Sequence, residues 1–115
     1  MHELPVMQKV VEVVLRHAGK HRVERVAAVH LQVGELSDLQ EEWMQRYFDR
    51  LSSGTVAEGA RLKVERTQAR LGCRSCGREY PWSAGAASQA CPACGAEGGE
   101  LVSGREYTIT SLEAI

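Results

Sequence analysis

The chain has 115 residues, and its 14 Lys and Arg against 15 Asp and Glu give a formal net charge of -1. This length suits one compact domain or two very small ones. The balanced charge provides no general attraction to nucleic acid or to an anionic membrane, and no apolar run approaches the roughly 20 residues that span a bilayer. Because the N-terminus lacks the basic and then apolar pattern of a signal peptide, we expect a cytoplasmic protein.

The first part of the chain predicts one helix followed by one strand. Apolar residues recur at i, i+3, i+4 and i+7 between Met7 and Ala18, which is typical of an amphipathic helix. Pro5 suits the first turn of this helix, and Gly19 suits its end. Apolar and polar residues then alternate over 28–33, which predicts a half-buried strand.

A second helix and two further strands are expected downstream. Residues 37–40 fit a capping box, with Ser37 as the N-cap and Gln40 reaching back to it. The expected buried face of the helix comprises Leu39, Trp43, Tyr47, Leu51, Met44 and Phe48. Alternation over 60–65 and a strand-like run at 107–110 complete the pattern. The predicted fold class is α+β, with a small sheet of about three strands packed with two helices.

Composition changes abruptly near Leu71. Residues 71–100 contain six glycines, all four cysteines and no Val, Ile, Met or Phe. Such a stretch cannot bury enough apolar surface to offset its chain entropy, so we expect a covalent or metal cross-link. The predicted organisation is an αβ domain made of 1–70 with 101–115, and an inserted zinc-ribbon-like domain at 71–100.

Two Cys-x-x-Cys hooks, Cys73 with Cys76 and Cys91 with Cys94, are separated by fourteen residues. A two-residue gap lets both sulfurs of a hook face one ion, and the glycine after each hook lets the backbone fold around the ligands. Four thiolates suit tetrahedral Zn(II), although the same geometry also fits iron. Because protein fills all four positions, we expect a structural ion. Two disulfides or reduced structural thiols are the alternative.

Other functions of a zinc ribbon have to be weighed. Basic and acidic residues balance between 70 and 106, which is a weak electrostatic footprint for nucleic acid. Tyr80 and Trp82 could stack on bases, but next to Pro81 we expect them to cover the hooks as a small core. A rubredoxin-like iron electron carrier is another alternative. Such a protein would be coloured and redox active as isolated, so a colourless, zinc-containing preparation would dismiss it. The sequence contains no recognisable nucleophile elbow and no marked acid pair, so it does not predict an enzyme.

The N-terminus is a second candidate metal site. The Met1 amine, the main-chain nitrogen of His2 and the His2 imidazole can close adjoining chelate rings, and planar nitrogen donors suit Ni(II) and Cu(II). Glu3 adds another main-chain nitrogen and a carboxylate. His17 and His21, at i and i+4, could bind a metal together, but we expect them on the solvent side of the first helix, where they favour its C-terminal dipole.

Several motifs occur in a defined order along the chain. They are Met1-His2-Glu3, Val33-Gly34-Glu35-Leu36-Ser37, Val56-Ala57-Glu58-Gly59 and the two Cys hooks. In this combination they resemble the HypA/HybF family of hydrogenase-maturation nickel chaperones, and the resemblance covers essentially the whole chain. Its most specific element is Met-His-Glu at the start together with the hooks, since zinc hooks alone occur in many unrelated folds.

The resemblance implies nickel delivery rather than enzymatic turnover. His2 would be the essential Ni(II) ligand, assisted by main-chain nitrogens that include that of Glu3. The four cysteines would hold a structural or regulatory Zn(II). Family members often carry a carboxylate at the position of Gln40, and this chain departs from the pattern there.

The resemblance also implies partners. They are a HypB-type GTPase, the large subunit of [NiFe] hydrogenase and, for some members, urease maturation proteins. Neither nucleic acid nor a membrane is expected as a partner. The sequence contains no phosphate loop of the Gly-x-x-x-x-Gly-Lys-Ser/Thr type, so nucleotide hydrolysis would belong to a partner. A monomer and a homodimer are both compatible with the sequence.

Overall fold

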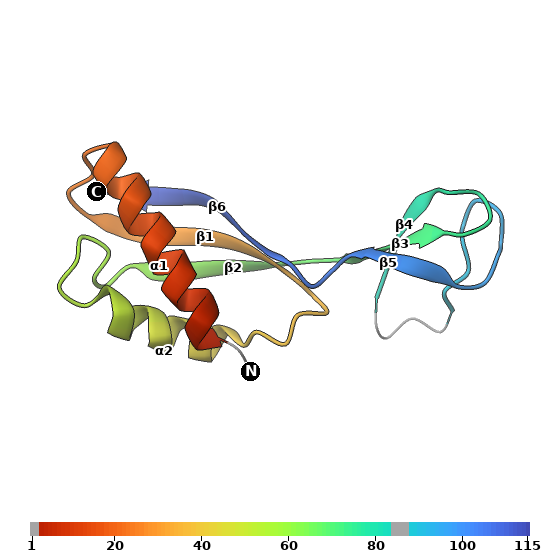
Figure 1. Cartoon of the computed structure of the whole chain (residues 1–115), viewed down its shortest axis with the longest axis horizontal. Helices are drawn as coiled ribbons and strands as arrows, with labels where there is room; N and C mark the ends of the chain where they lie inside the picture. Colours follow the sequence, from red (N-terminus) through yellow and green to blue (C-terminus); the bar gives the residue numbers. More distant parts are fainter. Residues whose placement is uncertain (1–2, 84–87) are drawn as a thin grey trace. The chain divides into compact units, whose positions relative to one another are not determined.

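The computed structural model describes residues 3–83 and 88–115. Along the chain, its helices and strands are α1 (Glu3–Lys20), β1 (Val26–Gly34), α2 (Glu41–Ser52), β2 (Arg61–Thr67), β3 (Ala69–Cys73), β4 (Glu79–Trp82), β5 (Gly99–Ser103) and β6 (Tyr107–Ala114). They form two compact units (Figure 1). Unit 1 combines the N-terminal segment up to Gln32 with Asp38–Glu65 and Thr108–Ile115, and unit 2 combines Val33–Ser37 with Arg66–Tyr107.

Helix α1 buries the predicted apolar stripe. Met7, Val10 and Val14 are at most 1% exposed, so the prediction from periodicity is confirmed. The predicted end at Gly19 is wrong, because the helix continues to Lys20. It ends in a Schellman motif, in which Arg22 adopts a left-handed conformation with φ of 53° and the N–H of Val23 donates to the carbonyl of Ala18 at 2.9 Å.

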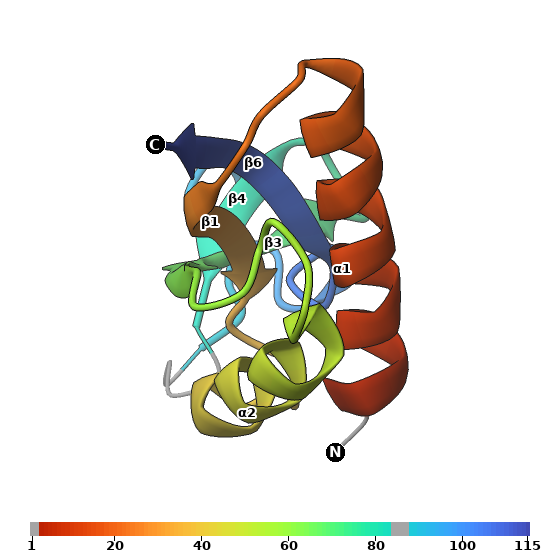
Figure 2. The same cartoon turned by 90° about the vertical axis from the view of Figure 1, so that its left-hand side faces the viewer.

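A three-stranded sheet with the order β2-β1-β6 forms the framework of the α+β fold. Helices α1 and α2 lie on one side of this sheet (Figures 1 and 2). The predicted strand at 28–33 is confirmed within β1, where Val29, Leu31 and Val33 are almost completely buried. The predicted fold class of two helices packed with about three strands is therefore confirmed.

Helix α2 differs from the prediction in its start and in part of its buried face. Its first residue is Glu41 and its N-cap is Gln40, which makes no side-chain capping hydrogen bond, so the predicted capping box with Ser37 as N-cap is wrong. The buried side of the helix carries Met44 and Phe48. The outer side carries Trp43, which is 38% exposed.

Contacts around Trp43 show how this residue is accommodated outside the core. Its ring stacks on Tyr47 with a centroid distance of 5.9 Å, and the guanidinium of Arg46 lies over the ring at 5.1 Å. Aromatic stacking and a cation–π contact thus cover Trp43 outside the core. Of the predicted buried face, Met44 and Phe48 are confirmed, and Leu39 is buried just before the helix. The prediction is wrong for Trp43, and Ser52 is buried on the same side as Met44 and Phe48 instead.

Unit 2 contains a second antiparallel sheet with the order β4-β3-β5. Leu71 of β3 lies opposite Tyr80 on one side and Leu101 on the other, next to an irregularity between Arg70 and Leu71. These three strands were not predicted, because 71–100 is poor in the β-branched residues that usually indicate strands. Their pairing brings the two ends of the segment together.

Backbone hydrogen bonds attach residues 33–37 to unit 2. The N–H of Glu35 donates to Thr67 at 2.8 Å, and the N–H of Leu36 donates to Gly104 at 2.9 Å. Gly34 lies so close to Gly104 that an added Cβ would be 2.1 Å from its carbonyl oxygen. The predicted assignment of nickel binding to 1–70 with 101–115 and zinc binding to 71–100 stays a prediction, and the compact units follow different boundaries.

Candidate metal centre

The two hooks share one backbone geometry. In the first, the N–H of Gly77 donates to the carbonyl of Cys73 at 2.9 Å, and in the second, the N–H of Gly95 donates to the carbonyl of Cys91 at 2.7 Å. Both glycines have positive φ, 76° and 78°, a conformation that residues with a side chain rarely adopt. The sequence Cys-x-x-Cys-Gly therefore forms the same tight turn twice, and each turn presents two sulfurs.

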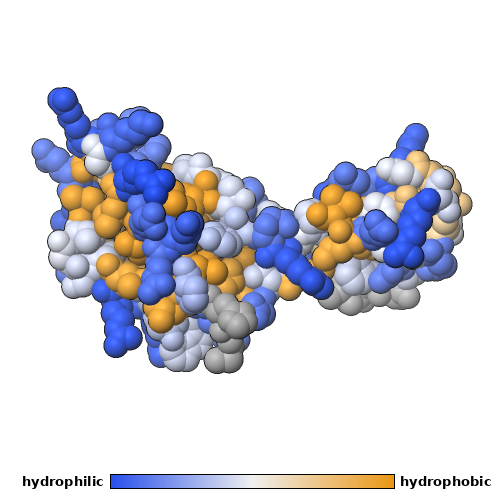
Figure 3. All heavy atoms as spheres, viewed as in Figure 1, coloured by the Kyte–Doolittle hydropathy of each residue, from blue (hydrophilic) through white to orange (hydrophobic). Residues whose placement is uncertain are grey.

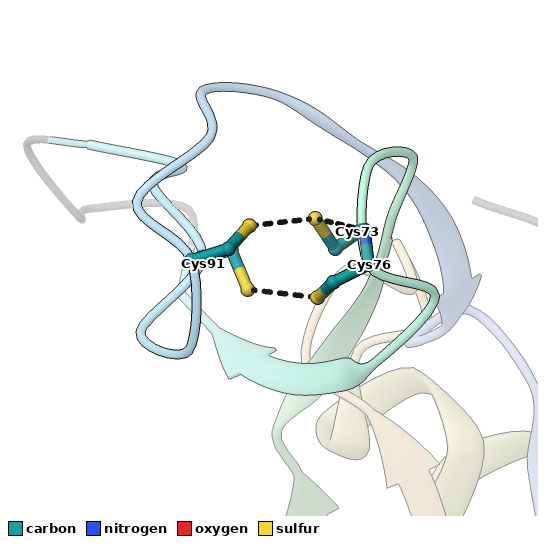
Figure 4. Close-up of side chains that lie close together, drawn as sticks. Cys73, Cys76 and Cys91 are labelled. Atoms are coloured by element: carbon teal, nitrogen blue, oxygen red, sulfur yellow. Dashed lines mark hydrogen bonds between the residues drawn. The ribbon is translucent and has the colours of Figure 1, made fainter.

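The four sulfurs form one cluster, as predicted from their spacing. Their Sγ atoms all lie within 4.8 Å of one another, with Cys73 to Cys94 at 3.5 Å and Cys76 to Cys91 at 3.7 Å. Figure 4 shows Cys73 and Cys76 of the first hook facing Cys91 of the second. A tetrahedral ion with metal–sulfur bonds of about 2.3 Å would place its ligands about 3.8 Å apart, so the cluster fits a four-thiolate metal site.

The same distances exclude the alternative of two disulfides. A disulfide bond is about 2.05 Å long, and all four cysteines are free. Cys73 and Cys91, the first residue of each hook, are buried, whereas Cys76 and Cys94 are exposed. An ion at the centre would thus be enclosed on one side by protein.

Local hydrogen bonds favour thiolates within the cluster. The N–H of Cys76 donates to the Cys73 sulfur at 3.4 Å and is the largest cause that lowers the pKa of Cys73 to about 6. The N–H of Cys94 lowers the pKa of Cys91 in the same way. For Cys94, the N–H of Ala96 acts in this direction too, but the hydrogen bond with Cys73 and burial raise its pKa to about 11. Each hook thus supplies one favoured thiolate for metal binding.

Aromatic residues cover the hooks, as expected. Leu71 and Tyr80 form a buried cluster with Cys73 and Cys91, and Trp82 packs against it. The Tyr80 hydroxyl donates to the carbonyl of Gln89. Tyr80 is only 4% exposed, so its ring belongs to the small core and is not presented for stacking on bases.

Charged residues around the cluster pair with each other. Arg70 lies 3.5 Å from Glu79, and Arg74 lies 3.7 Å from Glu100. These pairs agree with the balanced charge of the segment, and the interpretation as a nucleic-acid-binding ribbon is not favoured.

Of the predicted N-terminal site, the structure describes only Glu3, because Met1 and His2 lie outside the described residues. Glu3 is the first residue of α1 and only 4% exposed. Its Oε2 accepts a hydrogen bond of 3.0 Å from the main-chain N–H of Gln40, the N-cap of α2. The carboxylate thus lies at the positive end of α2, where a negative charge is stabilised.

Sequence reasoning missed this contact. The two residues are 37 positions apart, and no local motif connects them. An acidic residue at the start of a helix is common because it interacts favourably with the dipole of that same helix. The presence of Glu3 therefore gave no indication of a contact with α2. The prediction for the other histidines was better, since His17 and His21 are exposed at the end of α1, as expected.

Neither α1 nor α2 combines the length and the apolar composition that a membrane-spanning helix requires.

Comparisons with known proteins agree with the fold and the cluster. A family model described as hydrogenase/urease nickel incorporation, metallochaperone, hypA matches residues 1–114. Hydrogenase maturation factor HypA of Geobacter metallireducens is 41% identical over 113 residues, and the corresponding protein of Geotalea uraniireducens is 39% identical; both alignments cover 98% of each chain.

Two solved structures share the fold. The solution structure of the Ni metallochaperone HypA from Helicobacter pylori has a TM-score of 0.73 and 22% identity, covering 100% of this chain and 98% of that one. A second solution structure, of HypA protein, has a TM-score of 0.78 and 22% identity, covering 100% and 97%. The chain therefore belongs to the HypA family of hydrogenase and urease nickel metallochaperones, and it carries a four-cysteine metal-binding cluster.

Proposed function

We propose that this metallochaperone holds its Ni(II) cargo through the Met1 amine, the main-chain nitrogen and imidazole of His2, and the main-chain nitrogen of Glu3. Planar nitrogen donors are a preferred environment of Ni(II). Helix α1 begins at Glu3, and the first N–H groups of a helix have no partner within it. The positive end of the helix dipole also favours the negative charge of a deprotonated main-chain nitrogen.

The hydrogen bond between Glu3 and Gln40 is the observation that carries this proposal. Glu3 is 4% exposed and its carboxylate accepts a 3.0 Å hydrogen bond, so this group is already engaged by protein. Its role in the proposal is to anchor the residue that follows His2, while the nickel ligands are nitrogens. Gln40 contributes its main-chain N–H to this anchor, so the contact does not depend on the identity of its side chain.

Zinc is the ion we propose for the four-cysteine cluster. Four sulfurs within 4.8 Å of one another match a closed tetrahedral site, which leaves no open position for water or substrate. The ion would then be structural, and it would stabilise unit 2 rather than take part in nickel exchange.

Delivery of nickel follows from the small number of side-chain ligands in such an N-terminal site. A site with few side-chain ligands can release its ion as well as bind it, which suits transfer to a client rather than storage. We propose that the receiving machinery comprises a HypB-type GTPase and the large subunit of [NiFe] hydrogenase, and that the same chemistry also suits delivery to urease maturation proteins. In this proposal the protein acts in the cytoplasm, without catalysis of its own.

The test is a titration of Ni(II) into zinc-loaded protein with its native, untagged Met1, followed by calorimetry and by the visible absorption of planar nickel. His2→Ala should abolish the planar absorption and leave the zinc content unchanged. Glu3→Gln keeps the main-chain nitrogen and an acceptor oxygen, so it should retain planar nickel binding within about tenfold.

Two outcomes would contradict the proposal. Equal planar absorption in wild type and His2→Ala would exclude the N-terminal site. Complete loss of absorption in Glu3→Gln, with its fold intact, would make the Glu3 carboxylate a ligand and overturn its assignment as an anchor.

A further inference from the structure

Two imidazoles lie side by side at the C-terminal end of α1. The ring centroids of His17 and His21 are 4.4 Å apart, with the ring planes tilted by 47°. Both residues are exposed, and His17 also borders a hollow lined by residues 109–112 of β6. The outward face of α1 forms a hydrophilic band flanked by apolar surface (Figure 3). The proposed N-terminal site and the cysteine cluster use neither of them.

We propose that His17 and His21 form a second site for a divalent transition-metal ion, which takes Ni(II) weakly and exchangeably. The inference goes beyond the proposed function, because it requires neither His2 nor the four cysteines. Imidazole nitrogen is a suitable ligand for nickel, copper and zinc, and water would complete the coordination of an ion at this exposed position.

The ring separation fits two ligands in adjacent positions on one ion. A metal–nitrogen bond of about 2.1 Å places the centroid of each imidazole about 3.2 Å from the metal. Two ligands at a right angle then have centroids about 4.5 Å apart, close to the 4.4 Å between His17 and His21. The terminal torsion of histidine is broad, so the nitrogens can turn toward the ion without movement of the helix.

The backbone holds this separation. The N–H of His21 donates to the carbonyl of His17 at 3.1 Å, and the N–H of Val23 closes the helix end on Ala18 at 2.9 Å. Residues four apart on a helix lie on one face. Because the turn is already formed, binding would not require ordering of the chain, which lowers the entropic cost of chelation.

The local charges have opposing effects on a cation. Lys20 and Arg22 flank the pair, and both are exposed, so they weaken its attraction. Arg16 is paired with Glu12 at 2.8 Å, and the C-terminal end of a helix favours positive charge. Affinity would therefore come from coordination bonds, and protons would compete with the metal for the same nitrogens.

The pair is separate from the start of α1. His17 follows Glu3 by fourteen residues of one continuous helix, which corresponds to about 21 Å along its axis. A single ion cannot bridge this distance, so binding at the two places can be measured independently within one chain.

Nickel itself provides the spectroscopic distinction. Planar Ni(II) with four nitrogen ligands is diamagnetic and coloured, whereas Ni(II) held by two imidazoles and water is six-coordinate and paramagnetic. The experiment is a Ni(II) titration of zinc-loaded, untagged full-length protein, followed by visible absorption and by proton–nitrogen NMR. We expect the signals of His17, His21 and the last turn of α1 to broaden at micromolar excess of nickel.

Matched variants test the assignment. His17→Ala and His21→Ala should each remove the broadening and weaken binding at this site at least tenfold, while the control Lys20→Ala should retain it. Alanine favours helix, so these variants should remain folded. His2→Ala should abolish planar absorption and keep the broadening, which separates this inference from the proposed N-terminal site. Unchanged broadening in His17→Ala, or broadening only at millimolar nickel, would overturn the proposal.

Discussion

The interior of each compact unit is stabilised by a different kind of interaction. The four largest fully buried side chains, all in unit 1, are Phe48, Met7, Leu31 and Met44. The buried cluster of unit 2 consists of Leu71, Cys73, Tyr80 and Cys91. Half of that cluster is thus made of candidate metal ligands, whereas the core of unit 1 is made of ordinary apolar side chains.

This difference shows how a short segment with little apolar surface can still fold. Unit 1 gains its stability from burial of apolar area. We expect unit 2 to gain it from metal coordination, which in small metal-binding domains supplies folding free energy directly. The stability of unit 2 should therefore depend on metal concentration, and that of unit 1 should not.

The largest expected effect comes from loss of the metal. Chelation, or Cys73→Ser, should unfold unit 2 while the core of unit 1 remains, because structural zinc contributes on the order of 10 kcal/mol in comparable small domains. Proton–nitrogen NMR would show collapsed signals for residues of unit 2 and dispersed signals for α1 and α2. Ser75→Ala, between the ligands of the first hook, is the matched control and should retain metal. Persistence of native unit 2 signals without metal would break the comparison.

A smaller effect should follow from a cavity in unit 1. Phe48 is fully buried, so Phe48→Ala should lower the free energy of unfolding by about 3–5 kcal/mol with no change in metal content. Trp43→Ala, one helical face away and 38% exposed, should cost less than about 1.5 kcal/mol. Urea denaturation followed by circular dichroism would measure both. Equal losses would mean that the aromatic residues of α2 share one core.

The close approach at Gly34 provides a third test. An added Cβ would lie 2.1 Å from the carbonyl oxygen of Gly104, so Gly34→Ala should destabilise the protein by about 1–3 kcal/mol through overpacking. Gly19→Ala has the opposite expectation, because it lies within α1 and nothing is within 4 Å of its added Cβ. That variant should gain up to about 1 kcal/mol. Thermal unfolding of the two variants would show whether the signs differ.

The smallest effect concerns pH and unit 1. The pKa of Glu113 lies below its ordinary value of 4.5, mainly because Lys63 and then His30 hydrogen-bond to its carboxylate. Because the folded-state pKa is lowered, this stabilisation is complete above the unfolded pKa and is lost as pH falls through the folded value. Between pH 6 and pH 3, the urea midpoint of wild type should fall more than that of Glu113→Gln. Parallel curves would show that the cross-strand pairs contribute nothing.

Some features of the protein were predictable because their signals are local. The apolar period of α1 and the alternation in β1 each reflect a choice of face by neighbouring residues, and both predictions are confirmed. The hooks were predictable for the same reason, since Cys-x-x-Cys-Gly forms its turn within five residues. The sulfurs of the two hooks then meet in one cluster.

Other predictions failed where a distant residue competed with a local preference. Periodicity alone placed Trp43 in the core, but stacking on Tyr47 and the contact with Arg46 stabilise it outside. The capping box over 37–40 is locally plausible, yet Ser37 belongs to unit 2 and the helix begins at Glu41. The αL position after α1 fell on Arg22 rather than Gly19, because the helix end is fixed by hydrogen bonds to Ala18 and Gly19.

The sequence by itself determined the main elements of unit 1, the four residues of the cysteine cluster and the family, because each depends on residue types at short, regular spacing. Only the tertiary structure decided that Trp43 of α2 lies outside the core, that Glu3 receives the N–H of Gln40, and that residues 33–37 join the strands of unit 2. These features depend on contacts between segments that are distant in the chain. Their free energy comes from hydrogen bonds and packing that form only once both segments are in place.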